Sequence, residues 1–223
     1  MESKSIFYNM SMIVLGMSGK MGVGKNYLSE CYIIPMIIEH YRKEGITIIP
    51  YFFSFANFMK SELYARDTLD ILNYRNMFVC KTQDTRKKLQ QYGTEMGRNS
   101  VHDRIWIKHV ELWIKIQAEQ LMTVSNNCKD MQMVPLFVIQ DIRFKNELEF
   151  VQGLSNAMVI RVEAPKRHLQ RCLSENSQNQ HISEKDLDDV IFPTTLYNDE
   201  DYPLDIKDQI NIGITSLLIR LFF

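Results

Sequence analysis

A glycine-rich segment near the N-terminus constrains this 223-residue chain more than any other feature. Residues 19–25 have the spacing G-x-x-x-x-G-K, in which successive backbone N–H groups surround a polyphosphate and the lysine ammonium reaches its terminal oxygens. The apolar run 12–15 predicts a short buried strand, and the residues from Tyr27 onward predict a helix, so the helix N-terminus is directed at the phosphates. The alternative is a glycine-rich surface turn. The residues predicted to bind nucleotide phosphates are Gly19, Lys20, Met21, Gly22, Val23, Gly24 and Lys25.

Asn26 follows the loop lysine, at the position where a serine or threonine would supply a hydroxyl group to Mg²⁺. An amide oxygen can ligate magnesium or hold one of its water molecules. Asn26 is therefore a candidate metal ligand, either directly or through water.

The composition limits the remaining function classes. An apolar content of 45 % is sufficient for one core, and the length fits one α/β domain. A net charge of -1 without a long basic run argues against a nucleic-acid-binding surface. The four cysteines lie far apart, which predicts neither a zinc site nor a disulfide framework. The N-terminal segment has too short an apolar patch for a signal or membrane segment, so we expect a soluble, cytoplasmic protein.

The chain after the loop predicts a helix at 26–44, with a kink at Pro35 and an end at Gly45. Residues 46–53 are rich in β-formers and predict the second strand. Because Pro50 cannot donate a hydrogen bond to a neighbouring strand, this strand should lie at a sheet edge.

Two helices are predicted to frame a binding pocket. The helix at 85–97 has an apolar face that includes Met96, and a second face that is small and basic enough for close approach of a ligand. That second face carries Arg86, Gln90, Gly93 and Gly97. The helix at 103–122 should be well buried, with Trp113 in the core and Trp106 placed either in the core or over a pocket.

Polar residues near the ends of two strands are further candidates. Asp141 follows the apolar run 136–139, where a ligand of magnesium-bound water or of the acceptor is expected in phosphate-binding proteins; the alternative is a plain turn residue. Arg143 is suited to hold a phosphate with two parallel hydrogen bonds. Lys60 lies in a helical stretch after the second strand, near the edge where open α/β sheets bind ligands, although an ordinary surface lysine is an equal alternative.

Residues 165–189 are polar and show little apolar periodicity, so we expect a mobile lid that contributes nothing to the core, with Arg167 closing on the nucleotide. A solvated surface loop is the alternative. Strands at 157–162 and 194–197 and a helix at 204–221 complete the chain. The sequence therefore predicts a single domain over residues 1–223: a three-layer α/β fold with about five parallel strands and helices on both faces.

Several separated segments resemble one family, the bacteriophage-type deoxynucleoside monophosphate kinases. The family's helix motif R-x-x-L-Q-x-x-G-T-E is matched at 86–95, with Trp106 in the helix that follows. Its strand motif D-V-R-F-x-N-E is matched at 141–147 as D-I-R-F-K-N-E. Three further elements match at 159–162, 181–184 and 198–199. Together with the glycine-rich loop, these blocks follow the order of the family and cover nearly the whole chain.

The resemblance implies a P-loop kinase fold and the transfer of phosphate from ATP, with Mg²⁺, to a deoxynucleoside monophosphate. It implies that Asp141 and Arg143 lie between the two nucleotides. The family often has aspartate after the loop lysine, which makes Asn26 a small departure. The residues that the resemblance places around the acceptor are Lys60, Arg86, Gly93, Thr94 and Trp106.

Two other functions stay open. Animal-type phosphomevalonate kinase resembles the same scaffold, but the segments 93–95 and 144–147 match the nucleotide enzymes better. A nucleotide-binding module that hydrolyses ATP or GTP slowly is the other alternative, although the sequence lacks a guanine-reading N-K-x-D stretch. If the protein acts on nucleotides, its expected partners are small-molecule nucleotides. We expect neither nucleic acid nor a membrane as a partner, and homodimer formation is left open.

Overall fold

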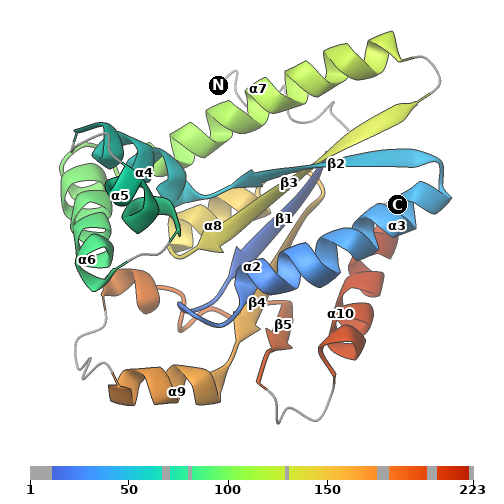
Figure 1. Ribbon diagram of the computed structural model, residues 1–223. Helices are drawn as coiled ribbons and strands as arrows, with labels where there is room; N and C mark the ends of the chain where they lie inside the picture. The colour runs from blue at the N-terminus through green and yellow to red at the C-terminus, as the bar shows by residue number, and fades with distance from the viewer. Residues whose placement is uncertain are drawn as a thin grey trace.

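A computed structural model describes residues 12–66, 71–79, 82–128, 131–174, 181–199 and 205–220. Five parallel strands form one sheet in the order β2-β3-β1-β4-β5 (Figure 1). The strands are β1 (Ile13–Ser18), β2 (Ile46–Phe53), β3 (Gln132–Ile142), β4 (Ala157–Glu163) and β5 (Thr194–Tyr197). The predicted parallel sheet of about five strands is confirmed.

Alternation along the strands creates two cores, because successive side chains point to opposite faces of a sheet. Leu15 of β1 and Val138 of β3 pack on one face, with buried residues of α3 (Ile34–Lys43) and α10 (Ile206–Arg220). Val14 and Phe137 pack on the other face, with α4 (Phe55–Arg66), α7 (Ile105–Asn127) and α8 (Lys145–Gln152). Figure 1 shows the sheet between these helices, so the predicted three-layer α/β fold is confirmed.

The remaining described elements are short. They are α2 (Lys25–Leu28), η1 (Ser29–Ile33), α5 (Ile71–Tyr74), η2 (Arg75–Val79), α6 (Gln83–Gln91), η3 (Tyr92–Asn99), α9 (Pro165–Ser174) and η4 (Ile182–Glu184). Three of them, η1, η2 and η3, are π-helical, and η4 is a 3₁₀-helix.

Two local predictions in the first half of the chain are confirmed. Among the described strands β2 pairs only with β3, which places Pro50 on an edge strand as expected. The helix after the loop is interrupted near Pro35: the π-helical η1 comes first, and α3 then starts with the proline in its first turn. Proline has no N–H to donate to the carbonyl four residues back, which accounts for the irregular turn. Gly45 ends the helix with a φ of 75°.

The helix predicted at 85–97 forms, but its register changes partway. Helix α6 runs into the π-helical η3, and a π-helix has a wider turn than an α-helix. Leu89 and Tyr92 are buried, whereas Met96, which was predicted to lie on the apolar face, is 53 % exposed. The wider turn rotates Met96 away from the apolar face and turns Gly97 inward.

Helix α7 is longer than predicted and buries only one face. Its buried positions form one stripe at a spacing of three or four residues, with Trp106 at the edge of that stripe: Ile107, Val110, Ile114, Ala118 and Leu121. Trp113 falls outside this face and is 47 % exposed. The predicted core role of Trp113 is therefore wrong.

The segment 165–189 is more ordered than predicted where the structure describes it. Its first part is helix α9, and Leu187 is only 4 % exposed within the core. The expectation that nothing in this segment joins the core is therefore wrong; one leucine among polar neighbours gives no periodic signal. Residues 175–180 lie outside the described part, and closure of a lid stays a prediction.

The predicted C-terminal helix falls partly outside the described residues. Helix α10 forms there, with Ile210 buried, but the predicted end at residue 221 and the side chains from position 214 onward are not described. In the described parts of the chain, no helix has both the length and the apolar character needed to span a bilayer.

Gly97→Ala should destabilise the fold, because a Cβ atom there would lie 2.4 Å from the Trp106 ring. Overpacking of this kind costs about 1–3 kcal/mol of unfolding free energy. Gly153→Ala is the matched control: its Cβ would meet only backbone oxygens, at 3.3 and 3.5 Å. Urea unfolding of both variants measures the difference, and equal stabilities would show that the Gly97–Trp106 contact is not tight.

Candidate functional site

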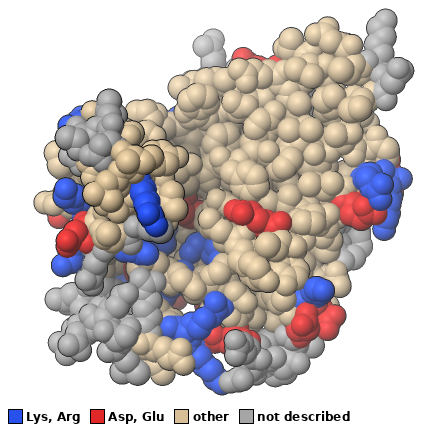
Figure 2. Space-filling view, viewed as in Figure 1, with Lys and Arg blue, Asp and Glu red and all other residues tan. Residues whose placement is uncertain are grey.

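A cavity of about 330 Å³ opens at the C-terminal end of the sheet, beside the glycine-rich loop. Figure 2 shows basic atoms in the hollow between the α4–α6 region and the body that carries the sheet. The cavity brings together most of the sequence-predicted site residues, which lie far apart in the chain. Those that line it are Met21, Gly22, Lys25, Asn26, Lys60, Arg86, Gly93, Thr94, Trp106, Asp141 and Arg143. Gly19, Lys20, Val23, Gly24 and Arg167 do not line it.

The loop is shaped by three glycines with positive φ. Gly19, Gly22 and Gly24 have φ angles of 135°, 84° and 91°, values that side chains with a Cβ rarely adopt. Gly24 then starts helix α2 from the left-handed region. The loop curls around its own lysine: the Lys25 ammonium donates to the carbonyl oxygens of Gly19 at 2.7 Å and of Lys20 at 2.9 Å.

Burial of Lys25 changes its acid–base chemistry. Desolvation, followed by the nearby Arg143 charge, lowers the Lys25 pKa to about 7. Removing the ammonium from water disfavours its charged form, and a second cation adds to this effect. A polyphosphate brought to the loop would supply the negative charge that restores the ammonium.

Asp141, near the C-terminal end of strand β3, is hydrogen-bonded to the start of α4. Its Oδ2 accepts a hydrogen bond from the Ser54 hydroxyl at 2.5 Å, and its Oδ1 accepts from the Phe55 amide at 3.0 Å. A carboxylate has about four acceptor positions, so this one can hold a further ligand while staying fixed. Ser54 was not predicted from the sequence, since a lone serine after a strand carries no pattern.

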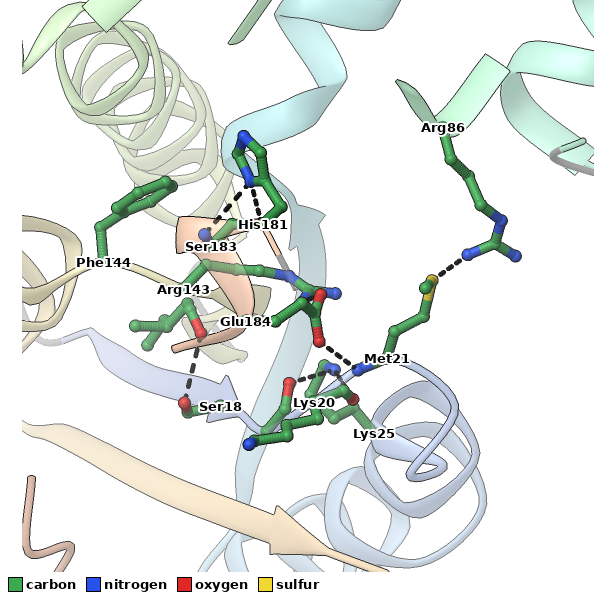
Figure 3. Close-up of polar contacts among 12 residues, drawn as sticks. Ser18, Lys20, Met21, Lys25, Arg86, Arg143, Phe144, His181, Ser183 and Glu184 are labelled. Atoms are coloured by element: carbon green, nitrogen blue, oxygen red, sulfur yellow. Dashed lines mark hydrogen bonds and ion pairs between the residues drawn. The ribbon is translucent and has the colours of Figure 1, made fainter. Parts of the chain in front are cut away.

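Arg143 is placed at the cavity but is already paired. Its guanidinium donates to the Glu184 carboxylate, and the second oxygen of that carboxylate accepts from the Met21 amide at 3.0 Å. Figure 3 shows the Glu184 carboxylate between the arginine and the glycine-rich loop. Sequence reasoning matched 181–184 to a family element but did not place Glu184 in the site.

A buried ion pair lies behind Arg143. The Glu147 carboxylate pairs with Arg98 and also accepts the backbone N–H groups of Arg143 at 2.8 Å and Phe144 at 3.1 Å. Burial raises the pKa of Glu147 to about 7. This carboxylate fixes the backbone from which the Arg143 side chain extends. Sequence reasoning missed Arg98, which lies in η3 one residue beyond the end of the helix predicted at 85–97.

The other end of the cavity is apolar and aromatic. Trp106 is 3 % exposed, lines the cavity, and donates its indole N–H to the Gly93 carbonyl at 2.8 Å. Gly93 leaves room for a neighbouring side chain, since a Cβ there would lie 2.6 Å from the Met59 sulfur. Arg86 reaches back to the glycine-rich loop, where its guanidinium contacts the Met21 thioether (Figure 3).

Lys60 is not an ordinary surface lysine. The residue is 9 % exposed, and its ammonium lies 3.3 Å from the Asn57 side-chain oxygen at the cavity wall. A buried cation beside Asn57 is available to an anionic group in the cavity.

Lys20 and Arg167 lie beside the loop and outside the cavity. The Lys20 ammonium pairs with Asp188 at 2.9 Å. Arg167 donates to the Asn198 carbonyl oxygen, while the Asn198 amide donates to the Val23 carbonyl at 2.9 Å. Their predicted contacts with a nucleotide stay predictions.

The oxygen atoms that line the cavity fit a Mg²⁺ ion that keeps most of its water molecules better than a metal ion coordinated only by protein side chains. Among the residues described, no three or more His, Cys, Asp or Glu side chains cluster so as to hold a metal. Asn26 and Asp141 both line the cavity next to the loop. Magnesium usually keeps several water molecules and binds through one or two protein oxygens plus substrate phosphates.

Binding of Mg-ATP should be coupled to proton uptake by Lys25. At pH 8 a lysine with a pKa of about 7 is mostly neutral, and bound phosphate raises that pKa. Titration calorimetry in buffers of different ionisation enthalpy should show uptake approaching about one proton, with affinity falling as the pH rises above 7. The Lys25→Met variant is the control and should show no uptake; equal uptake in both proteins would contradict this assignment.

No protein-family model and no curated protein matches the sequence. Similar solved structures include a gluconokinase from Sinorhizobium meliloti 1021, with 12 % identity and a TM-score of 0.37 over 96 % of this chain and 98 % of that one. TT1252 from Thermus thermophilus has 14 % identity and a TM-score of 0.34 over 94 % of this chain and 98 % of that one. A shikimate kinase from Bacteroides thetaiotaomicron has 12 % identity and a TM-score of 0.33 over 95 % of this chain and 99 % of that one. Likeness at this level supports no conclusion about substrate, and the fold rests on the sheet order and loop geometry described above.

Proposed function

We propose that the protein transfers a phosphoryl group from ATP to a deoxynucleoside monophosphate, yielding the diphosphate and ADP. One observation carries the proposal: a single cavity runs from the glycine-rich loop to the aromatic wall at Trp106. Such a cavity can hold a polyphosphate at one end and a flat base at the other. Phosphoryl transfer depends on bringing two substrates together and neutralising charge, which this arrangement supports.

The residues between the two ends of the cavity supply positive charge for the phosphoryl group. Lys25 and Arg143 are cations at the wall of the cavity nearest the loop, and Asp141 is fixed close by. Mg²⁺, held through phosphate oxygens with help from Asn26 and Asp141, would neutralise further charge on the transferred group. Lys25 and Arg143 would follow the phosphate oxygens as negative charge builds on them. No covalent intermediate is required.

The acceptor end favours a nucleotide over phosphomevalonate. Trp106, Leu89 and Met59 give this end an apolar wall that fits the face of a base. Arg86 and Lys60 are cations near that wall and suit the acceptor phosphate. Phosphomevalonate offers no ring to stack on Trp106.

A cavity of this size also favours a kinase over a slowly hydrolysing switch. Hydrolysis needs only a water molecule beside the terminal phosphate, whereas about 330 Å³ lined by Gly93, Thr94 and Trp106 fits part of a second substrate.

The direct test is product formation from ATP with each deoxynucleoside monophosphate, each ribonucleoside monophosphate and phosphomevalonate. Each reaction is compared with ATP hydrolysis without an acceptor. The proposal expects a diphosphate product from at least one deoxynucleotide, at a rate well above hydrolysis. It is wrong if phosphomevalonate alone is phosphorylated, or if no acceptor raises ADP release.

The Lys25→Ala variant should lose on the order of 10²- to 10³-fold in kcat.

Replacement of Trp106 tests where the base binds. Stacking on an aromatic ring contributes about 1–3 kcal/mol per base in single-strand binders. Trp106→Ala should therefore raise the acceptor KM by roughly tenfold or more, since 1.4 kcal/mol is a factor of ten. The KM for ATP should stay nearly unchanged.

Trp113→Ala is the matched control, because the same helix carries this tryptophan with 47 % of it exposed and away from the cavity. It should leave both KM values unchanged. Since Trp106 is buried, thermal unfolding is measured in parallel and Trp106→Phe is included as a milder change. An unaltered acceptor KM in a folded Trp106→Ala protein would exclude the stacking role.

A further inference from the structure

The carboxylate of Glu184 occupies a position suited to phosphate. It accepts the backbone N–H of Met21, within the glycine-rich loop, at 3.0 Å and binds the Arg143 guanidinium with its other oxygen. Both donors are groups that the proposed reaction assigns to a nucleotide phosphate. In Figure 3 one carboxylate bridges the two.

The electrostatic surroundings explain why a carboxylate is stable there. Lys25, Arg143 and Arg161 bring positive charge to the same end of the sheet, and Arg143 and Arg161 each lower the pKa of Lys25. Glu184 acts in the opposite direction and raises that pKa. Glu184 is thus a counter-ion for the cationic cluster when no phosphate is bound.

The segment that carries Glu184 is fastened to the rest of the molecule independently. Lys145 pairs with Asp189 at 2.7 Å, and the Lys145 amide donates to Asp186 at 2.8 Å. Leu187 is anchored in the core. Displacing the Glu184 side chain therefore does not require this segment to leave the protein.

We propose that Glu184 is an internal substitute for phosphate, which a polyphosphate must displace from the Met21 amide and Arg143 before it can bind. A phosphate and a carboxylate cannot share these donors without strong like-charge repulsion. The carboxylate holds the loop amide and the arginine in place in the empty protein and lowers the apparent affinity for polyphosphate. This inference rests on the proposed phosphate site but not on the identity of the acceptor.

The test is titration calorimetry of the full chain with inorganic tripolyphosphate and, separately, with Mg-ATP, without acceptor. Glu184→Gln keeps the size of the side chain and removes its charge. Asp189→Asn is the matched control, since it removes a carboxylate from the same segment at its contact with Lys145. We expect Glu184→Gln to bind both ligands about tenfold more tightly than the wild type, equal to 1.4 kcal/mol. Asp189→Asn should stay within about twofold of it.

Equal or weaker binding by a folded Glu184→Gln protein would overturn the inference and leave the proposed phosphate site intact. Absence of binding to wild type and variant alike would overturn both. Should Glu184→Gln fail to fold, Glu184→Asp decides: it keeps the charge, but its shorter chain cannot reach both Met21 and Arg143. Tighter tripolyphosphate binding by Glu184→Asp supports displacement, and unchanged binding contradicts it.

Discussion

The structure depends on a lysine ammonium that is held inside a loop of backbone carbonyls. Lys25 donates to two carbonyl oxygens of its own loop, and this arrangement needs the positive φ angles of Gly19 and Gly24. An ammonium removed from water is costly unless it is hydrogen-bonded and near negative charge. The loop supplies the hydrogen bonds, and the carboxylates of Glu184 and Asp141 supply negative charge in the absence of a ligand. A site with this balance is arranged to accept an anion.

The sheet order determines what surrounds that lysine. Strand β1 lies between β3 and β4, so the end of β3 places Asp141 and Arg143 next to the loop that leaves β1. Asp141 then hydrogen-bonds to Ser54 and Phe55, which fixes the start of α4 and, through it, the wall that carries Lys60. Ligands of open α/β sheets bind at this position because the neighbouring connections separate there.

Local patterns were sufficient to predict the parts of the fold that depend on backbone chemistry. Pro50 placed β2 at an edge, and Gly45 marked the end of α3, since both effects arise within one residue. The prediction for Trp113 failed because Trp106, seven residues before it, lies at the edge of the buried stripe of α7, and seven residues fall about 20° short of two full turns, which carries position 113 beyond that edge. Glu184 and Arg98 lacked a local signal: their partners, Arg143 and Glu147, lie 41 and 49 residues away along the chain.

A bisubstrate analogue tests most directly whether the cavity is one site for two nucleotides. The analogue would join adenosine to a deoxynucleoside through a polyphosphate chain, and its binding would be measured in competition with labelled ATP and with labelled acceptor. We predict that one molecule per chain displaces both ligands. Displacement of ATP alone, with the acceptor still bound, would contradict a shared cavity and place the acceptor elsewhere.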